Sequence, residues 1–552
     1  MKFGSRHFEN AKTTDLLHEW ETFLCQDLAS CAEEGKLPSR NGYRARGNIS
    51  TNWIETQFGS FEKFIEWYSA NSKTYEDADP VDPSIFEDRE EKGEIPDLES
   101  WWEKRYAGKA KRRYIVSAAC GGGVVNQKHL DAVNTYRKER NAEFVVLTMK
   151  GVTKDDILID PKLQETADFI GGEIDFNSNL RAMDFRLHPA QVIGITGLKR
   201  FGQKDFSLLV AHTKQAMEAV PVATGSFPHL VYTTGCITKQ YYNSNRIGRI
   251  AEQDETYGGL IVEVVDKNIF HIRDFQFDAD GGFVDLGIRY SAEGAEEIGS
   301  VIVMGDIHIT DTDPLAEKAS NEQVALLKPR KAFYHDLFSG NTINHHVEHS
   351  ISKQTRIRES QGNLKQELDA VVSWLRSAAQ NFAGMEINIV ASNHNEWLDK
   401  WLEQGLYVKS PENHRIGLQL APFVLDGKNP LEEYFRKSFA LDEPIPSNVR
   451  FLRRSDSVKL HGFELALHGD KSHSGRFGSV LALEESFGKC IVGHHHSPKI
   501  FRGIRIVGTM TKLNLDYTEG YGSSWLHTNC VLYDNGTTQM LTAINGKWRA
   551  SF

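Results

Sequence analysis

The sequence predicts an α/β protein that is preceded by a small all-α module. Short runs of apolar, mostly β-branched residues alternate with stretches of helical periodicity from Tyr114 onward, which is typical of strands connected by helices. Before residue 70, only helical periodicity and turn signals occur. At 552 residues, the chain exceeds the roughly 250–300 residues at which a single core stops growing, so we expect two to four domains.

Residues 1–70 form the predicted helical module. The first helix carries an apolar stripe made of Leu16, Leu17, Trp20, Phe23, Leu24 and Leu28. Ser50 or Thr51 can cap a second, short helix that ends at Gly59, and Ser60 can cap a third. Three short helices joined by tight turns indicate a helix-turn-helix-like unit. A helical cap for protein interaction is the alternative.

Residues 71–112 differ in composition from both neighbours. The segment EDADPVDPSIFEDREEKGEIPDLES is acidic, rich in proline and poor in aliphatic residues, which is typical of a solvated linker. The chain then becomes basic through Lys109, Lys111, Arg112 and Arg113. This basic cluster either flanks a nucleic-acid groove or lies on the surface before the first strand.

Residues 113–295 make up a first α/β region. Strands are predicted at YIVSAA, EFVVLTM, VIGITG, SLLVAH and HLVYTTG, and a helix at KHLDAVNTYRKERNA. From residue 258 to 277, the strict alternation of GGLIVEVVDKNIFHIRDFQF predicts antiparallel hairpins.

Residues 296–552 repeat features of that first region. TTGCITKQYY at 233–242 resembles VGTMTKLNLDY at 507–517, and hairpins follow both. The strand YIVSAA then corresponds to VIVMGD, and SAACG stands where the second region has Gly305, Asp306 and His308. Two hypotheses explain the likeness: a duplication whose first copy is degenerate, or short strings shared by chance between two α/β regions.

The second region places polar residues at the ends of five apolar strands. Strand alternation directs residues i and i+2 to the same side, so Asp306 and His308 after VIVMG can face one spot beyond the carboxyl edge of a sheet, where open α/β sheets bind ligands. The other polar strand ends are Asp336, Asn393 with His394, His468 with Asp470, and His494 to His496. Carboxylate and imidazole together suit manganese, iron or zinc.

The order D-x-H, D, N-H, H, G-H-x-H over residues 300–520 resembles that of the calcineurin-like metallophosphoesterases, and most closely the SbcD-type DNA nucleases. The resemblance implies a two-sheet sandwich flanked by helices. It also implies two divalent metal ions, for which Mn²⁺ is the first choice and Fe²⁺, Zn²⁺ or Mg²⁺ are alternatives. A hydroxide between the two ions would attack the phosphodiester. The first ion would be held by Asp306, His308, Asp336 and His496. The second would be held by Asp336, Asn393, His468 and His494. His394 would be the catalytic residue, as general acid or as a stabiliser of transition-state charge.

The N-terminal pattern LPSRNGY, GNIS, FGSFEKFIE resembles a repeat found in homing endonucleases and other phage nucleases. The resemblance implies DNA binding, with phosphate contacts from Lys36, Arg40, Arg44 and Arg46. Taken together, the two resemblances suggest a phage-encoded nuclease of the pre-early class that degrades host DNA.

The chain departs from the family pattern at two motifs. His335 precedes Asp336 where the family usually has glycine, and SNHN stands where GNH followed by an acidic residue is common. The ligating atoms are retained, so metal binding should survive, although the loops around Asp336 and His394 must differ. Substrate phosphate could be reached by Asn344, His345 and Arg476, for each of which a solvated surface loop is the alternative.

Composition limits the remaining interpretations. A net charge of −11 argues against a uniformly basic nucleic-acid coat, although it allows a local basic site. Six cysteines without metal-knuckle spacing are typical of reduced thiols, and no stretch is apolar for about 18 residues, so we expect a cytoplasmic protein without membrane contact, in the host cytoplasm if phage-encoded.

We therefore predict a metal-dependent DNA nuclease. A phosphomonoesterase or small-molecule phosphodiesterase of the same superfamily is one alternative, because the metal core does not choose the substrate. A non-catalytic protein that binds DNA or a host factor is the other. A homodimer and a separate accessory protein remain open as partners, and the absence of a P-loop motif means that any ATPase would be a separate chain.

Overall fold

The chain forms two compact units, Met1–Arg105 and Tyr106–Phe552. The computed structural model describes residues 17–32, 36–75, 80–81, 112–152, 159–202, 206–223, 228–344, 362–438, 446–515 and 521–552, with residues 351, 354, 355, 357 and 359. Most of the predicted linker 71–112, and His345, lie outside these residues.

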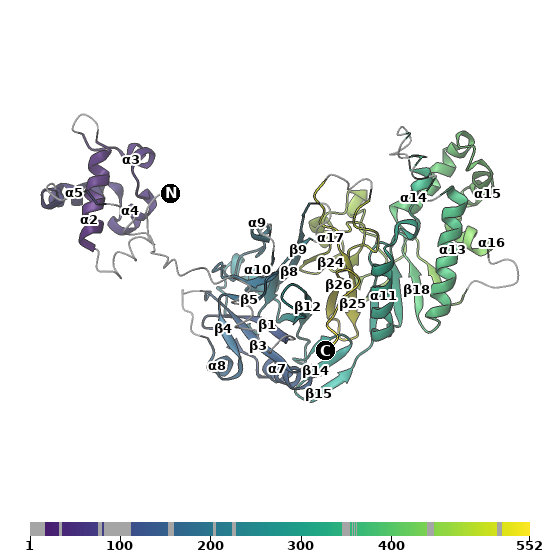
Figure 1. Ribbon diagram of the computed structural model, residues 1–552, viewed down its shortest axis with the longest axis horizontal. Helices are drawn as coiled ribbons and strands as arrows, with labels where there is room; N and C mark the ends of the chain where they lie inside the picture. Colours follow the sequence, from purple (N-terminus) through teal and green to yellow (C-terminus); the bar gives the residue numbers. More distant parts are fainter. Residues whose placement is uncertain are drawn as a thin grey trace. The chain divides into compact units, whose positions relative to one another are not determined.

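The first unit contains four helices in its described part (Figure 1). They are α2 (Leu17–Ser30), α3 (Arg40–Arg46), α4 (Thr51–Phe58) and α5 (Phe61–Tyr75). Trp20, Tyr43 and Phe64 are buried in their common core. Gly59 adopts a φ of 85° between α4 and α5, and the Ser60 hydroxyl accepts the Lys63 N–H at 3.2 Å, as the sequence predicted for this turn. The last helix extends past residue 70, because no glycine or proline interrupts it.

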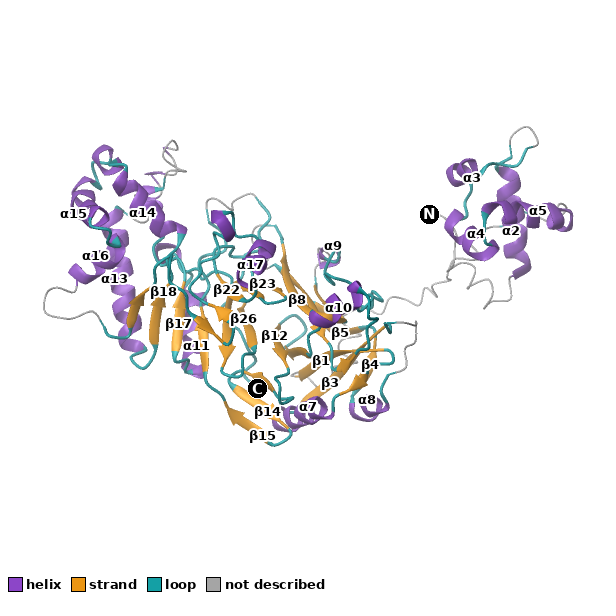
Figure 2. Ribbon diagram, turned by 180° about the vertical axis from the view of Figure 1, so that it is seen from behind, coloured by secondary structure: helices purple, strands orange, loops and turns teal. Residues whose placement is uncertain are grey.

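The second unit has a mixed α/β fold, which confirms the predicted class (Figure 2). Its first sheet has the order β12-β11-β1-β3-β4. The parallel strands are β1 (Arg112–Cys120), β3 (Ala142–Met149) and β4 (Phe169–Gly171), and the antiparallel strands are β11 (Gly258–Val264) and β12 (Phe270–Gln276). Helices α7 (Gln127–Arg140) and α8 (Pro161–Thr166) connect β1 to β3 and β3 to β4.

A six-stranded sheet forms the other end of this unit, with the order β19-β18-β17-β16-β25-β26. Its strands are β16 (Ser300–Val303), β17 (Lys331–Tyr334), β18 (Glu386–Ile389), β19 (Val449–Phe451), β25 (His527–Tyr533) and β26 (Thr538–Ala543). Its helices are α11 (Pro314–Leu327), α13 (Leu364–Asn381), α14 (Asn393–Glu403), α15 (His414–Leu425) and α16 (Pro430–Ser438). The last four gather beside β18, remote from β4 and α8 (Figures 1 and 2).

A ten-stranded sheet contains strands from both α/β regions. Residues 113–295 contribute β5 (Ile174–Asn177), β6 (Leu180–Ala182), β7 (Ser207–Val210), β8 (His212–Val220) and β9 (His229–Gly235). Residues 296–552 contribute β20 (Lys459–Leu460), β21 (Phe463–Glu464), β22 (Cys490–Val492), β23 (Lys499–Phe501) and β24 (Ile504–Ile506). The order is β20-β21-β22-β24-β23-β8-β9-β7-β6-β5.

Smaller elements complete the unit. The short antiparallel strands are β2 (Val124–Val125), which pairs with β10 (Thr238–Lys239), and the consecutive β13 (Phe283–Asp285), β14 (Ile288–Ser291) and β15 (Gly294–Glu297). The short helices are α9 (Lys199–Gly202), α10 (Arg246–Gln253) and α17 (Val480–Phe487), and the 3-10 turns are η2 (Ile309–Asp311), η3 (Asn341–Ile343), η5 (Leu406–Lys409) and η6 (His473–Gly475).

The two α/β regions have the same strand order. β1 and β16 each have a parallel partner on one side and an antiparallel partner on the other. In the shared sheet, β5-β6-β7-β9-β8 and β20-β21-β22-β24-β23 have the same order and the same relative directions. The halves join where β8 pairs antiparallel with β23, around the central pair Met217 and Ile500. Common ancestry, and the boundary between residues 295 and 296, stay predictions.

Two strand predictions were wrong or too long. VIGITG forms turns, not a strand: Gly197 has a φ of 80°, which lies outside the range of a strand, and Val192 and Ile193 are exposed while Ile195 is buried. The apolar strand predicted to end at His468 and Asp470, FELALHGD, is a strand only at Phe463–Glu464. Among the residues described, no helix has the length and apolarity needed to cross a membrane.

Candidate metal centre

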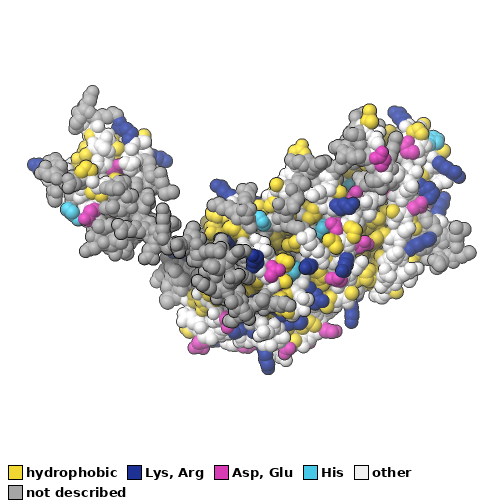
Figure 3. All heavy atoms as spheres, viewed as in Figure 1, with side chains coloured by type: hydrophobic (Ala, Val, Ile, Leu, Met, Phe, Trp, Pro, Cys, Tyr) yellow, Lys and Arg dark blue, Asp and Glu magenta, His cyan; other side chains and the backbone are white. Residues whose placement is uncertain are grey.

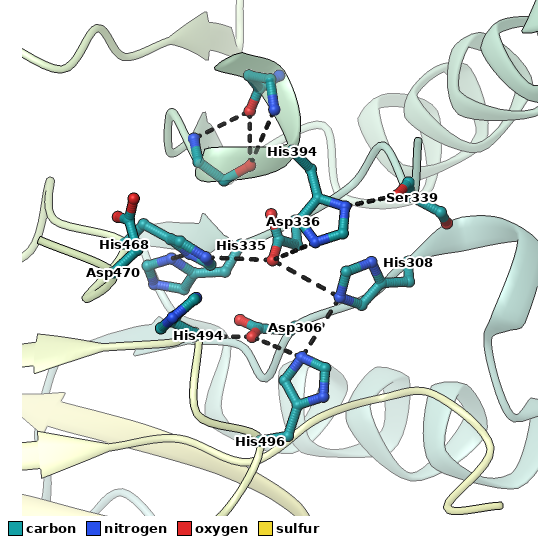
Figure 4. Close-up of polar contacts among 12 residues, drawn as sticks. Asp306, His308, His335, Asp336, Ser339, His394, His468, Asp470, His494 and His496 are labelled. Carbon is teal, nitrogen blue, oxygen red and sulfur yellow. Dashed lines mark hydrogen bonds and ion pairs between the residues drawn. The ribbon is translucent and has the colours of Figure 1, made fainter. Parts of the chain in front are cut away.

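The ends of β16, β17 and β22 bring five of the predicted ligands to one place (Figure 4). Asp306 and His308 follow β16, Asp336 follows β17, and His494 and His496 follow β22. β16, β17 and β22 all stop just before these residues, and β16 and β17 run parallel, so their carboxyl ends meet at one edge.

Four of these residues surround one position. Asp306, His308, Asp336 and His496 offer ligand atoms that all lie within 4.8 Å of one another, and all four residues are buried. His496 Nε2 is 3.0 Å from Asp306 Oδ2, and His308 Nε2 is 3.6 Å from Asp336 Oδ2. These four residues are the predicted ligands of the first ion.

The backbone around Asp306 leaves little freedom to its carboxylate. Oδ2 accepts the His494 backbone N–H at 2.7 Å, and the Asp306 carbonyl accepts the Thr509 hydroxyl at 2.9 Å. A Cβ at Gly493 would lie 2.1 Å from Asp306 Oδ1, so glycine is needed beside this ligand. The carboxylate is therefore held in place before any ion binds, which is the preorganisation that a metal site requires.

The residues predicted for the second ion are placed differently. His468 Nε2 lies 3.1 Å from Asp336 Oδ2, and the His494 ring lies 5.1 Å from the His468 ring, measured between centroids. Asn393 begins α14, and its Oδ1 is buried. A second set of ligand atoms within 4.8 Å is formed by Asp306, His335 and His468, which adds a histidine that was not predicted as a ligand.

The backbone of four candidate ligands is left-handed. The φ angles are 48° at His308, 46° at Asp336, 73° at His494 and 55° at His496. Side chains rarely adopt this region, and each such residue costs about 1–3 kcal/mol. Strain of this kind persists where the surrounding structure imposes it, and it is commonly found at functional sites.

Electrostatics set the protonation of the ligands. Burial would raise the pKa of the Asp306 carboxyl, but the hydrogen bond from His496 and nearby imidazoles lower it to about 2. Burial also opposes ionisation of Asp336, yet His468 and His394 hold the pKa of that carboxyl well below its usual range. Burial lowers the pKa of His308 to about 3. Anionic carboxylates and a neutral imidazole are the forms that bind metal.

His468 has the opposite shift. Burial would lower the pKa of its imidazole, but the adjacent Asp336 carboxylate raises it to about 9. A cation that binds beside Asp336 therefore competes with a proton on His468.

Several buried polar atoms of the cluster have no hydrogen-bond partner within the described part of the chain. They are Asp306 Oδ1, Asp336 Oδ1, Asn393 Oδ1, His335 Nε2, His468 Nε2 and His496 Nδ1. Leaving such an atom unpaired costs about 1–3 kcal/mol. A divalent cation would satisfy carboxylate oxygens and imidazole nitrogens together, so this donor set fits a metal such as manganese, iron or zinc.

His394, the predicted catalytic residue, is more exposed than the four clustered ligands, with a side chain that is 16% exposed. Its Nδ1 faces the Ser339 carbonyl, which can only accept, so Nδ1 carries the proton of the neutral ring. Nε2 is then directed toward Asp336, 4.0 Å from Oδ2. The Trp397 ring packs against His394 with 4.0 Å between centroids, which fixes the imidazole plane.

The described substrate-binding candidates lie in different places. Asn344 follows η3 and lines a cavity of about 210 Å³ with Trp401 and Asn413, and none of the described ligands lines it. Arg476 follows η6 and is exposed, and the ring of the next residue, Phe477, lies 5.9 Å from the His494 ring between centroids. His345 lies outside the described residues.

The basic residues predicted to contact DNA lie in the first unit, on and just before α3. Lys36, Arg44 and Arg46 are exposed. Arg40 instead forms a bidentate ion pair with Glu55 of α4, so its guanidinium already has a role within the unit.

His335 is the residue that sequence reasoning missed. It was noted as a departure from the family pattern, yet the structure buries it completely against Asp306 and His468. Its sequence signal is weak, because a polar residue one place before a ligand is expected to point away from it in a strand. The left-handed turn at Asp336 breaks that alternation.

Comparison with known proteins gives a relative but no family. No protein-family model matches the chain. The chain is 29% identical over 365 residues to Protein A1 of Escherichia phage T5, a match that covers 62% of this chain and 64% of Protein A1. The chain thus spans less than two thirds of the length of that relative. A phage relative agrees with the predicted phage origin, while the metallophosphoesterase resemblance rests on the motifs.

Proposed function

We propose that the chain is a metal-dependent phosphodiesterase that cleaves DNA, with a metallophosphoesterase-type catalytic region at residues 296–552. The observation that carries the proposal is the buried cluster of Asp306, Asp336 and surrounding histidines, in which the Oδ1 atom of each carboxylate lacks a hydrogen-bond partner among the described residues. Anionic oxygens and imidazole nitrogens in a buried site suit divalent ions, and divalent ions serve phosphoryl transfer.

The proposed ligands form two groups that share Asp336, whose Oδ2 lies 3.6 Å from His308 Nε2 and 3.1 Å from His468 Nε2 (Figure 4). Asp306, His308, Asp336 and His496 would hold the first ion. Asp336, Asn393, His468 and His494 would hold the second. Two divalent ions in these places would polarise the phosphoryl oxygens and lower the pKa of water.

His394 would supply the proton for the leaving group. Hydrolysis adds water at phosphorus and breaks the P–O3′ bond, and the electron pair of that bond remains on the leaving oxygen. With Nδ1–H donating to the Ser339 carbonyl, Nε2 is the nitrogen that can hold a proton for this oxygen. The Trp397 contact keeps Nε2 pointed at the cluster.

DNA would be recruited through basic side chains. Lys36, Arg44 and Arg46 are exposed in the first unit, and Lys and Arg side chains also lie over the α13–α16 end of the second unit (Figure 3). Such contacts neutralise phosphates without reading sequence. Since the relative is a phage protein, we propose host DNA as the substrate.

The test is incubation of the full chain with Mn²⁺ and linear, circular or single-stranded DNA, next to a chromogenic phosphomonoester. We expect DNA cleavage that EDTA stops. Hydrolysis of the monoester alone, with DNA intact under every metal, would favour a small-molecule phosphatase. If neither substrate is cleaved but DNA is retained, the chain is a binding protein.

A further inference from the structure

His335 lies beside His468 in the cluster (Figure 4). It follows β17 directly and is fully buried. Its Nδ1 lies 3.4 Å from Nδ1 of His468, and the two rings are 5.5 Å apart between centroids. Gly493 makes the space, because a Cβ there would lie 3.0 Å from His335 Cγ.

Two facing imidazole nitrogens must divide the roles of donor and acceptor. A nitrogen that binds a cation carries no proton, and a neutral imidazole keeps its single proton on the other nitrogen. His468 directs Nε2 at Asp336, so Nδ1 is its protonated nitrogen when Nε2 is a ligand. The only arrangement consistent with this has His468 Nδ1–H donating to His335 Nδ1.

We propose that His335 is a positioning residue for His468. It accepts the Nδ1–H hydrogen bond, and thereby fixes the ring so that Nε2 faces the ion beside Asp336. The inference rests on the metal centre of the proposed function, but not on DNA as substrate. Residues that support a metal ligand in this way typically change metal affinity by about 10–100-fold when removed.

A rival role for His335 is that of a direct ligand through Nε2. That atom has no hydrogen-bond partner in the described structure, and His335 belongs to a group of potential ligands with Asp306 and His468. The two roles use different nitrogens of the ring, so amide substitutions can separate them. Asparagine places its oxygen near the position of Nδ1, whereas glutamine reaches the position of Nε2.

The test measures Mn²⁺ binding to the full chain by titration calorimetry, with metal content after dialysis as a second readout. His335→Asn should keep both ions within about threefold of wild-type affinity, whereas His335→Gln and His335→Ala should weaken one ion by about 10–100-fold. As a matched control, His129→Asn replaces another buried histidine, which stacks on Phe277 at 4.0 Å between centroids, and should leave both affinities unchanged.

Retention by His335→Gln with loss in His335→Asn would overturn the proposal in favour of a direct ligand. Unchanged affinity in all three variants would overturn it as well. If thermal melting shows that His335→Asn does not fold, the comparison of Gln with Ala decides: equal losses support the positioning role, and retention by Gln refutes it. A wild-type chain that binds two ions but leaves DNA intact would contradict the proposed substrate and leave this inference standing.

Discussion

In residues 113–295, strand β1 ends in Ala118 and Cys120, whereas in residues 296–552 strand β16 is followed by Asp306 and His308. The structure equates Ala118 with Asp306, whereas the alignment of YIVSAA with VIVMGD sets Ala119 opposite Asp306, one residue later. Ala118 forms an isolated parallel bridge with Cys236, and Asp306 forms the same kind of bridge with Thr509. The first region therefore has the same strand end, bridged to the same kind of neighbouring segment, but it lacks a carboxylate like that of Asp306.

What surrounds these positions also differs. Ala118, Cys120, Met149 and Cys236 form a small buried apolar cluster, which fills the place that Asp306 and His308 occupy in the second region. Left-handed residues other than glycine in the described part of the first region are Asn141, Arg186 and Leu286, none of which is at this strand end. At this strand end, left-handed backbone therefore accompanies the charged residues and is missing where they are missing, although left-handed residues such as Asn141 and Lys328 also occur elsewhere in both regions.

The largest effect is expected from Asp336, which lies between both groups of ligands. Asp336→Asn should reduce DNA hydrolysis by about 10³-fold or more, because each ion loses a charged ligand. Cys120→Ala is the matched control at the corresponding strand end of the first region, and should keep wild-type activity. The test measures DNA hydrolysis and bound metal in both variants. Equal losses of activity in Asp336→Asn and Cys120→Ala would mean that the first region also takes part in catalysis.

His394→Ala should reduce turnover by about 10²–10⁴-fold while both ions stay bound, because His394 would move a proton and hold no metal. The pair of measurements is single-turnover DNA cleavage and Mn²⁺ content after dialysis. Loss of metal in this variant would contradict the role assigned to His394.

Much of the site could be predicted because its residues end apolar strands. Apolar runs, which predict buried strands, precede Asp306, His308 and Asp336. Because these strands are parallel, their carboxyl ends lie close together. His335 could not be assigned, because its direction depends on the left-handed backbone at Asp336, which no local pattern encodes.

The pairing of strands β8 and β23, which joins the two regions, could not be predicted from the sequence pattern either. β8 and β23 are separated by most of the second unit in sequence, and their pairing depends on which sheet edges remain open after each half has folded. VIGITG failed for a local reason: its apolar residues suit a strand, but the segment forms turns and Gly197 has a left-handed φ of 80°.

The buried ion pairs of Arg273 in the first region stabilise the fold, and the Arg273→Met variant tests this. Arg273 is fully buried and bonds Glu263 at 2.8 Å and Asp285 at 2.7 Å, and Glu263 also accepts the Ala550 N–H at 2.9 Å. Removing one partner of a buried ion pair costs about 3–5 kcal/mol, so we expect that loss in the free energy of unfolding from denaturant melts. Arg330→Met, which breaks the half-exposed pair with Asp534, should cost less than about 1 kcal/mol.

The free energy lost in Arg273→Met should depend on pH in a predictable direction. Burial would raise the pKa of Glu263, but Arg273 lowers it far below its usual value, so this interaction stabilises the fold above about pH 4 and is lost as pH falls further. Without Arg273, the buried carboxyl is easier to protonate. The stability gap between wild type and Arg273→Met should therefore narrow from pH 7 to pH 3, and a constant gap would contradict the ionic origin of the effect.

The smallest effect is expected from removing residues 1–75, which have a hydrophobic core of their own. DNA affinity at low salt should fall by about tenfold, because basic contacts on a tethered module add to those of the catalytic region. Turnover of a small chromogenic phosphodiester should not change. In the full chain, replacing Lys36, Arg44 and Arg46 by glutamine should lower the slope of log affinity against log salt by about three, one for each lost phosphate contact. Unchanged affinity and slope would assign the module to protein contacts, and would leave DNA capture to the same region that holds the metal ligands.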